Sequence, residues 1–301
     1  MASGKLRAGF IGASGMMGHG MAKNILAKGH PLSLTVHRNE DAVKDLIAAG
    51  ASRVESPAAL AAASDVVFIC VTGSPQVEEQ FKGPGGLLEG GRKGLYIVDC
   101  STSEPDSTAR LREAALAKGM ILLDAPLART PVEAEEGRLN VMIGASDADY
   151  RVLEPVLKTF AENVFHVGEA GSGHIVKLLN NFIAQAICTA AAEAFAVGAK
   201  AGIDPKKLVE VVTAGGVNSG LFQAMGKTLT GDLQGLKFGL DNARKDVRYY
   251  THLAESNNVP SVVGEAVHQT LCLASALGYG AEFVPSLVRA QEKVTGVKLV
   301  P

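Results

Sequence analysis

The sequence comprises 301 residues, of which 47% are hydrophobic and 20% charged, and it contains 34 Gly, four Cys and no Trp. This composition excludes collagen-like, disordered and disulfide-scaffold proteins, and the length suggests two domains. The formal net charge of −2 produces no field that would hold nucleic acid or an anionic membrane without a local patch, so we expect neither as a partner.

The cysteines give no sign of a disulfide framework or a metal site. They are Cys70, Cys100, Cys188 and Cys272, which lie far apart without the spacing of metal ligands. We therefore expect no metal and reduced, mostly buried thiols. The longest apolar stretch, 184–199, is interrupted by Glu193 and is shorter than the ~20 apolar residues of a membrane span. Glycines between residues 9 and 18 argue against a secretory signal helix, so the sequence predicts a cytoplasmic protein.

Short apolar runs alternate with longer segments rich in Ala, Leu and Lys in the first half of the chain. The runs are 8–11, 32–36, 66–71, 96–99 and 121–124, followed by 141–144 and 163–167. Continuously apolar runs are typical of strands buried on both faces of a sheet. The segments between them, 17–27 and 41–49 among them, read as helices. The alternation predicts an α/β domain with a parallel sheet.

The pattern changes after residue 168. One long helical pattern covers 174–202, and further helical segments continue to about residue 293. Clusters of Gly, Pro and Asn interrupt them at 202–205, 215–216, 257–260 and 278–280. We therefore predict an N-terminal domain at 1–168 and an all-helical domain at 169–301.

A glycine-rich turn follows the first predicted strand, and a helix is expected to begin near Met16. The turn consists of Gly12, Ala13, Ser14, Gly15, Met16, Met17 and Gly18. Strand, glycine turn and helix N-terminus form an anion site, because unpaired N–H groups and the positive end of the helix dipole face a pyrophosphate. A glycine-rich turn alone is weak evidence for a nucleotide site. The alternative is a turn that binds no ligand. Its place on the first βα connection favours a dinucleotide site at residues 12–17.

The end of the second predicted strand bears on the choice of cofactor. Sites for NAD usually carry Asp or Glu here for the ribose hydroxyl, whereas Arg suits the 2′-phosphate of NADP. This chain has Arg38, so we expect NADP(H) to be favoured, with NAD(H) possible. The alternative is that Arg38 is a solvent-exposed arginine on a loop and does not contact the cofactor.

Lys177 and Asn181 are the strongest candidates for chemistry. Their i, i+4 spacing places an ammonium and an amide on one face of the long helix, where both can reach one small substrate. Reduction of a carbonyl leaves an oxygen that needs a proton, and a positioned ammonium can supply it. If Lys177 is considered without the neighbouring motifs, the alternative interpretation is a solvent-exposed lysine on a helix.

Together these segments resemble the β-hydroxyacid dehydrogenase family, which includes 3-hydroxyisobutyrate dehydrogenase and several semialdehyde reductases. The resemblance rests on 16–18 with 21–24, Asp-x-Ser-Thr-x-x-Pro at 99–105, Asp-Ala-Pro at 124–126 with 136–139, Lys-x-x-Asn-Asn at 177–181, and Phe238 with Lys245-Asp246. It implies a Rossmann domain, a long interdomain helix, an all-α C-terminal domain and a homodimer or homotetramer.

The resemblance also implies roles for single residues. Lys177 and Asn181 match the catalytic lysine and the asparagine that orients the substrate. The substrate-binding residues would be Ser101, Thr102, Arg129, Thr130, Asn180 and Phe238. The cofactor would be bound by Gly12, Ser14, Gly15, Met16, Met17, Arg38, Val71, Thr72, Thr102 and Lys245.

One departure from the family bears on the substrate. Residues 127–130 read Leu-Ala-Arg-Thr where most members carry Val-Ser-Gly-Gly. The sulfolactaldehyde reductase branch similarly carries Gly-Arg-Thr, and a guanidinium suits a sulfonate or a second carboxylate. The alternative is that Arg129 pairs with Glu133 or Glu135 and shapes the loop.

We therefore expect an NAD(P)-dependent oxidoreductase that interconverts a small anionic 3-hydroxy acid, or its sulfonate analogue, with the aldehyde or semialdehyde. Hydride would move to or from the nicotinamide while Lys177 exchanges the proton. The alternatives are a 6-phosphogluconate dehydrogenase-like activity, an imine reductase or a non-catalytic member. Retention of Lys177 with Asn181 argues against the last two, and the lack of an obvious phosphate-binding cluster in the second domain argues against the first.

Overall fold

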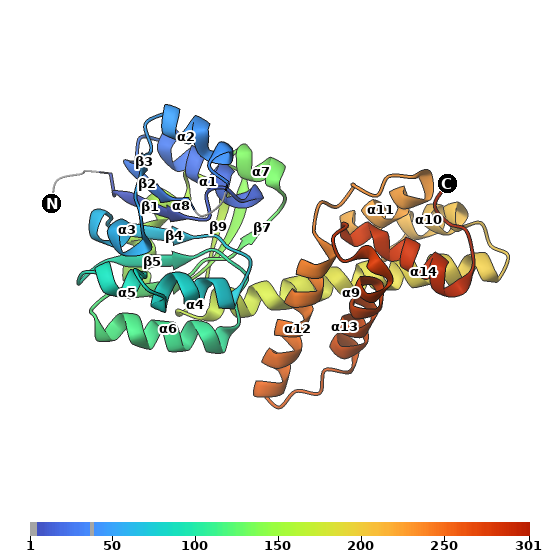
Figure 1. Ribbon diagram of the computed structural model, residues 1–301. Helices are drawn as coiled ribbons and strands as arrows, with labels where there is room; N and C mark the ends of the chain where they lie inside the picture. Colours follow the sequence, from blue (N-terminus) through green and yellow to red (C-terminus); the bar gives the residue numbers. More distant parts are fainter. Residues whose placement is uncertain (1–4, 37–38) are drawn as a thin grey trace. The chain divides into compact units, whose positions relative to one another are not determined.

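The computed structural model describes residues 5–36 and 39–301 (Figure 1). The chain forms two compact units, Met1–Lys177 and Leu178–Pro301. The division falls inside helix α9 (Ser172–Lys200), whereas the sequence suggests a boundary at residue 168, before that helix. The first turn of α9 belongs to the first unit because its backbone N–H groups bond to the end of a strand of the sheet there.

The first unit is built on a mostly parallel sheet with the strand order β3-β2-β1-β4-β5-β6-β8-β7, with β9 beside β8. The strands are β1 (Ala8–Ile11), β2 (Leu32–Thr35), β3 (Ser52–Arg53), β4 (Val66–Ile69), β5 (Tyr96–Asp99), β6 (Ile121–Asp124), β7 (Leu127–Ala128), β8 (Leu139–Gly144) and β9 (Ala161–Gly168). All seven predicted strands are present. The pairings of β8 with β6 and β7 are antiparallel.

The register of the central strands brings their carboxyl ends to one level. Ile11 pairs with Ile69, Ile69 with Asp99, and Asp99 with Asp124. The loops that follow β1, β4, β5 and β6 therefore emerge at the same edge, which is where open α/β sheets bind their ligands.

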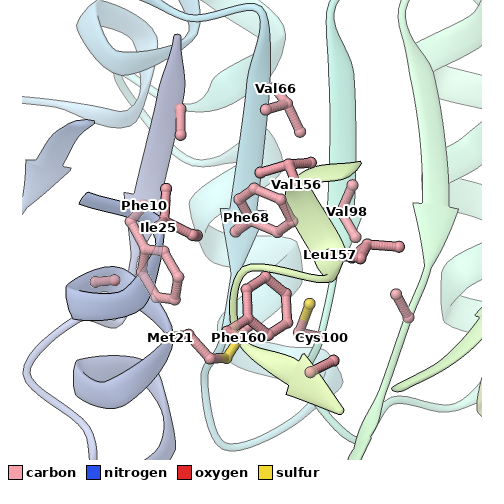
Figure 2. Close-up of a cluster of buried hydrophobic side chains, with 14 of the residues drawn as sticks. Phe10, Met21, Ile25, Val66, Phe68, Val98, Cys100, Val156, Leu157 and Phe160 are labelled. Carbon is pink, nitrogen blue, oxygen red and sulfur yellow. The ribbon is translucent and has the colours of Figure 1, made fainter. Parts of the chain in front are cut away.

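Helices cover both faces of this sheet. They are α1 (Met16–Ala27), α2 (Lys44–Ala48), α3 (Pro57–Ala63), α4 (Ser74–Lys82), α5 (Leu87–Gly90), α6 (Pro105–Ala117), α7 (Pro131–Glu135) and α8 (Asp147–Leu157). Side chains of α1, α2, α7 and α8 pack with Phe10 and Phe68 on one face, and α3 to α6 pack with Ile69 on the other. Figure 2 shows part of the first core, where the Phe68 and Phe160 rings meet edge to face at 5.7 Å. Burial on both faces explains the continuous apolar runs.

The second unit is helical. It contains the rest of α9 with α10 (Pro205–Thr213), α11 (Gly220–Gly226), α12 (Leu240–Ser256), α13 (Val262–Ala274) and α14 (Leu287–Thr295). The predicted interruptions are confirmed: α10 starts after its N-cap Asp204, and α12 ends before Asn257. Helix α9 is long and apolar enough to cross a membrane by length and composition. However, Cys188 and Phe195 of α9 pack into the core of this unit, as expected of a core helix.

Candidate functional site

The glycine turn between β1 and α1 depends on the absence of side chains. Gly12 has φ +93°, and a Cβ there would lie 2.1 Å from the carbonyl oxygen of Cys70. A Cβ on Gly18 would lie 2.2 Å from the carbonyl oxygen of Gly12, so only glycine lets α1 approach the strand this closely. Gly15 is the N-cap of α1, and no described side chain caps that terminus. The amide groups at this helix start therefore fit a pyrophosphate.

The loops after β4 and β5 lie beside this turn at the same edge of the sheet. The Val71 N–H donates to the Ser101 hydroxyl oxygen at 3.0 Å, which joins the two loops. Ser14, Met16 and Thr72 are exposed there. Burial raises the pKa of the neighbouring Cys70 thiol to about 12, so it stays protonated at neutral pH. His37 and Arg38 lie outside the described residues.

Two buried carboxylates at the ends of β5 and β6 organise this edge. Asp99 accepts hydrogen bonds from the Ser101 N–H at 2.9 Å and the Ser103 hydroxyl at 2.8 Å. Asp124 accepts from the N–H groups of Gly171 at 2.6 Å and His174 at 2.8 Å, and it thereby caps the start of α9. These hydrogen bonds of Asp99 and Asp124 were not predicted. The position of each Asp at the end of an otherwise apolar strand is a signal in the sequence that could have indicated them.

Lys177 is half-buried one turn after this cap. Its Nζ donates to the carbonyl oxygen of Leu127 at 2.6 Å, so the ammonium is held against the segment that follows β6. An ammonium has three N–H donors, and this bond uses one of them. The structure therefore places Lys177 in the same unit as the glycine turn and Ser101.

The segment at 127–130 is held by two sets of contacts. Thr130 is the N-cap of α7 and forms a capping box with Glu133, and the Thr130 hydroxyl lowers the pKa of the Glu133 carboxyl. The Arg129 backbone is left-handed, with φ +82°. Its guanidinium pairs with Glu162 of β9 and donates to the carbonyl oxygen of Arg138. Arg129 therefore pairs with a glutamate, but the partner is neither Glu133 nor Glu135.

Four of the predicted site residues lie in the second unit, whereas Thr102 lies in the first. Asn181 is buried and donates from Nδ2 to Asp246 Oδ2 at 2.6 Å. Lys245 Nζ lies 2.8 Å from Asp246 Oδ1 and 4.8 Å from the centre of the Tyr249 ring. Asn180 donates to the Asn181 side chain at 3.1 Å, and Phe238 is half-buried against the core of this unit.

The comparisons with known proteins extend over both units. Residues 7–168 match the family described as NAD binding domain of 6-phosphogluconate dehydrogenase, and residues 171–290 match the family described as NAD-binding of NADP-dependent 3-hydroxyisobutyrate dehydrogenase. The chain is 33% identical to 2-(hydroxymethyl)glutarate dehydrogenase of Eubacterium barkeri, covering 98% of this chain and 97% of the relative. It is 31% identical to 2-hydroxy-3-oxopropionate reductase of Escherichia coli, covering 98% and 100%.

Two solved structures show the same fold. The crystal structure of 3-hydroxyisobutyrate dehydrogenase from Salmonella typhimurium is 28% identical, with a TM-score of 0.82 over 95% of this chain and 99% of that one. The structure of Psf3 in complex with NADP⁺ and 2-OPP is 25% identical, with a TM-score of 0.79 over 94% and 99%.

Proposed function

The chain belongs to the β-hydroxyacid dehydrogenase family of NAD(P)-dependent oxidoreductases, and we propose that it interconverts a small anionic 3-hydroxy acid with its aldehyde or semialdehyde. The observation that carries the proposal is the position of Lys177. Its ammonium is held by Leu127 in the unit that also contains the glycine turn. A lysine held there can serve the oxygen of a reacting carbonyl group.

Lys177 would donate a proton to the carbonyl oxygen during reduction and take a proton from the hydroxyl group during oxidation. The bond to Leu127 holds the ammonium in place, and a lysine ammonium can act as a general acid. When bound, the nicotinamide cofactor supplies or accepts the hydride. Ser101 can contribute a second donor, because its oxygen accepts from Val71 while its own hydrogen can be donated to the substrate.

Arg129 would bind a second anionic group of the substrate. A guanidinium carries five N–H donors, and both contacts of Arg129 involve Nη1. A carboxylate or sulfonate could therefore be bound beside Glu162 or in its place. The name of the Eubacterium barkeri relative denotes a hydroxy acid with two carboxylates, which supports a substrate of this class.

The other assignments from the sequence belong to the same proposal. The substrate would further contact Thr102, Thr130, Asn180, Asn181 and Phe238. The cofactor would be held by Gly12, Ser14, Gly15, Met16, Met17, Val71, Thr72, Thr102 and Lys245. A preference for NADP(H) rests on Arg38. We further infer a cytoplasmic homodimer or homotetramer, in line with the family resemblance.

A spectrophotometric screen tests this function. The purified protein would be assayed with NADPH and NADH against tartronate, methylmalonate and succinic semialdehydes, sulfolactaldehyde and glyoxylate. In the oxidative direction it would be assayed with NADP⁺ and NAD⁺ on 2-(hydroxymethyl)glutarate. We expect saturable turnover of at least one compound with two anionic or polar ends, faster with NADPH. A cyclic imine and 6-phosphogluconate serve as comparisons, and turnover of only these would contradict the proposal.

A further inference from the structure

A fully buried histidine lies beside the candidate site, and the mechanism above does not use it. His174, in the first turn of α9, is 0% exposed. Its Nδ1 lies 2.8 Å from the hydroxyl oxygen of Thr108 in α6, and its Nε2 lies 3.6 Å from Asp99 Oδ2 at the end of β5. Nε2 has no hydrogen-bond partner among the described residues within normal distance. The ring thus connects three elements of the first unit.

The two ring nitrogens face two different groups. A carboxylate oxygen accepts hydrogen bonds, so a hydrogen on Nε2 would be directed toward Asp99 Oδ2. The Thr108 hydroxyl lies near both Nδ1 and the carbonyl oxygen of Glu104, which is 3.2 Å away, and its one hydrogen can be donated to only one of them. The three side chains form a line of contacts from Asp99 through His174 to Thr108. Thr108 is itself buried within α6, so this line has no access to a substrate that a nucleophilic Asp-His-Thr triad would need.

His174 is attached by its backbone as well as by its ring. Its N–H donates to Asp124 of β6, while its ring faces Asp99 of β5, the carboxylate that also holds the Ser101 N–H. One turn later Lys177 donates to Leu127. The same residue therefore joins the loop that carries Ser101 to the helix that carries Lys177.

The backbone around this histidine lies close to the sheet. A Cβ on the preceding Gly173 would lie 2.5 Å from the carbonyl oxygen of Met142 in β8. A Cβ on Gly144 would lie 2.9 Å from Asp124 Oδ1. The backbone at the start of α9 thus approaches β6 and β8 closely. Toward β5, the approach is made by the imidazole side chain, which faces Asp99.

We propose that His174 is a positioning residue, whose imidazole sets the separation between Ser101 and Lys177. The inference rests on the proposed function of Lys177. Reaction rates are sensitive to misplacement of about 1 Å, which can cost about 100-fold. The glycine turn is held separately, by the contacts of Gly12 with Cys70, so removal of the ring should affect turnover and leave cofactor binding unchanged.

Two isosteric variants separate the contacts of the ring. In His174→Gln the amide nitrogen can occupy the place of Nε2 and donate to Asp99, whereas in His174→Asn it occupies the place of Nδ1 and the contact with Asp99 is lost. We expect kcat to fall about 10- to 100-fold in His174→Asn, with the Kd for NADPH unchanged, and to be largely recovered in His174→Gln. His30→Gln is the matched control, because His30 is also buried but bonds the Leu6 carbonyl oxygen, away from the site.

Amide hydrogen exchange of the same variants gives a readout independent of turnover. We expect faster exchange of residues 99–104 and 171–177 in His174→Asn, and unchanged exchange of residues 10–18. Unchanged exchange in those peptides would overturn the inference, as would equal kcat in His174→Asn and wild type, or a loss of kcat with no recovery in His174→Gln. If the wild-type protein reduces no aldehyde, the proposed function fails, and the exchange data alone decide whether His174 connects the two segments.

Discussion

At the scale of single residues, Arg129 combines an unfavourable backbone with a paired side chain. Its φ of +82° lies in the left-handed region, where a residue other than glycine costs about 1 kcal/mol or more. A glycine at this position would adopt this φ without such strain. The guanidinium pairs with Glu162 and is partly exposed, and exposed ion pairs contribute only about 0–1 kcal/mol. Stability therefore does not explain an arginine at this position, and we propose instead that it binds an anion.

Replacing Arg129 by glycine should separate binding from stability. We expect the free energy of unfolding of Arg129→Gly to change by less than about 1 kcal/mol, because relief of strain offsets the lost ion pair. The KM for a substrate with two anionic groups should rise about 10- to 100-fold, with that for glyoxylate unchanged. Arg138→Ala is the control, since Arg138 pairs with Glu136 on the surface. A KM that rises equally for both substrates would argue against a second anion site.

At the scale of elements, the start of α9 depends on glycine. A Cβ on Gly173 would lie 2.5 Å from the Met142 carbonyl oxygen and 2.9 Å from the Asp124 carboxylate. We expect Gly173→Ala to reduce the free energy of unfolding by about 1–3 kcal/mol and to lower kcat, because the helix start must move away from the sheet. Gly198→Ala in the same helix meets only Leu208, at 3.8 Å, and should be neutral or stabilising by up to about 1 kcal/mol. Urea unfolding of both variants checks this, and equal effects would refute it.

The strand starts are joined by an ion-pair cluster that titrates in acid. The Arg7 guanidinium, with Arg92 beside it, lowers the pKa of the Asp65 carboxyl from 3.8 to about 2. Because the folded pKa is depressed, the stabilisation is present above the unfolded pKa and is lost as the pH falls from about 4 toward 2.

Asp65→Asn should therefore lower the free energy of unfolding at pH 7 by about 1 kcal/mol, a value reduced for solvent screening of these partly exposed groups. Chemical unfolding at pH 7 and pH 3 would measure the difference, which should be smaller at pH 3. Asp41→Asn is the control, since the Asp41 side chain is 82% exposed and, among the described residues, forms an ion pair with Lys44 in the same turn. A difference that grows in acid would contradict the assignment.

The strands β1, β2, β4, β5 and β6 were predicted from their apolar runs, because helices cover both faces of the central sheet. The strand β9 was also predicted, although most of its residues are at least partly exposed. The strands β3 and β7 were missed, since they have two residues each and Ser52 and Arg53 are exposed. The helix expected at 41–49 is divided into a 3₁₀ turn at Asp41–Val43 followed by α2.

The site could be predicted only as far as its residues form local motifs. Lys177 and Asn181 were found from their spacing, and the glycine turn from its place after a strand. Partners that are distant in sequence left no such pattern: Glu162 reaches Arg129 because β9 pairs with β8, and His174 reaches Asp99 because α9 packs on the end of β5.

At the scale of the whole molecule, the chain has separate cores for its two units and one helix common to both. The sheet packs between helices in the first unit, and α9 to α14 form the core of the second. The glycine turn, Ser101, Arg129 and Lys177 belong to the first unit, and Asn181 and Lys245 belong to the second. The similarity to known dehydrogenases extends over both units, so the proposed reaction concerns the full chain.

The role of Lys177 is tested most directly by single-turnover kinetics of Lys177→Ala. With NADPH and the best semialdehyde from the screen, we predict that the rate of reduction falls about 100- to 10,000-fold, the range for loss of a general acid, while the Kd for NADPH stays within about twofold. Lys200→Ala, at the other end of α9, should match the wild-type protein. A Lys177→Ala enzyme that reduces the same substrate at close to the wild-type rate would contradict the assignment of Lys177 as the proton donor.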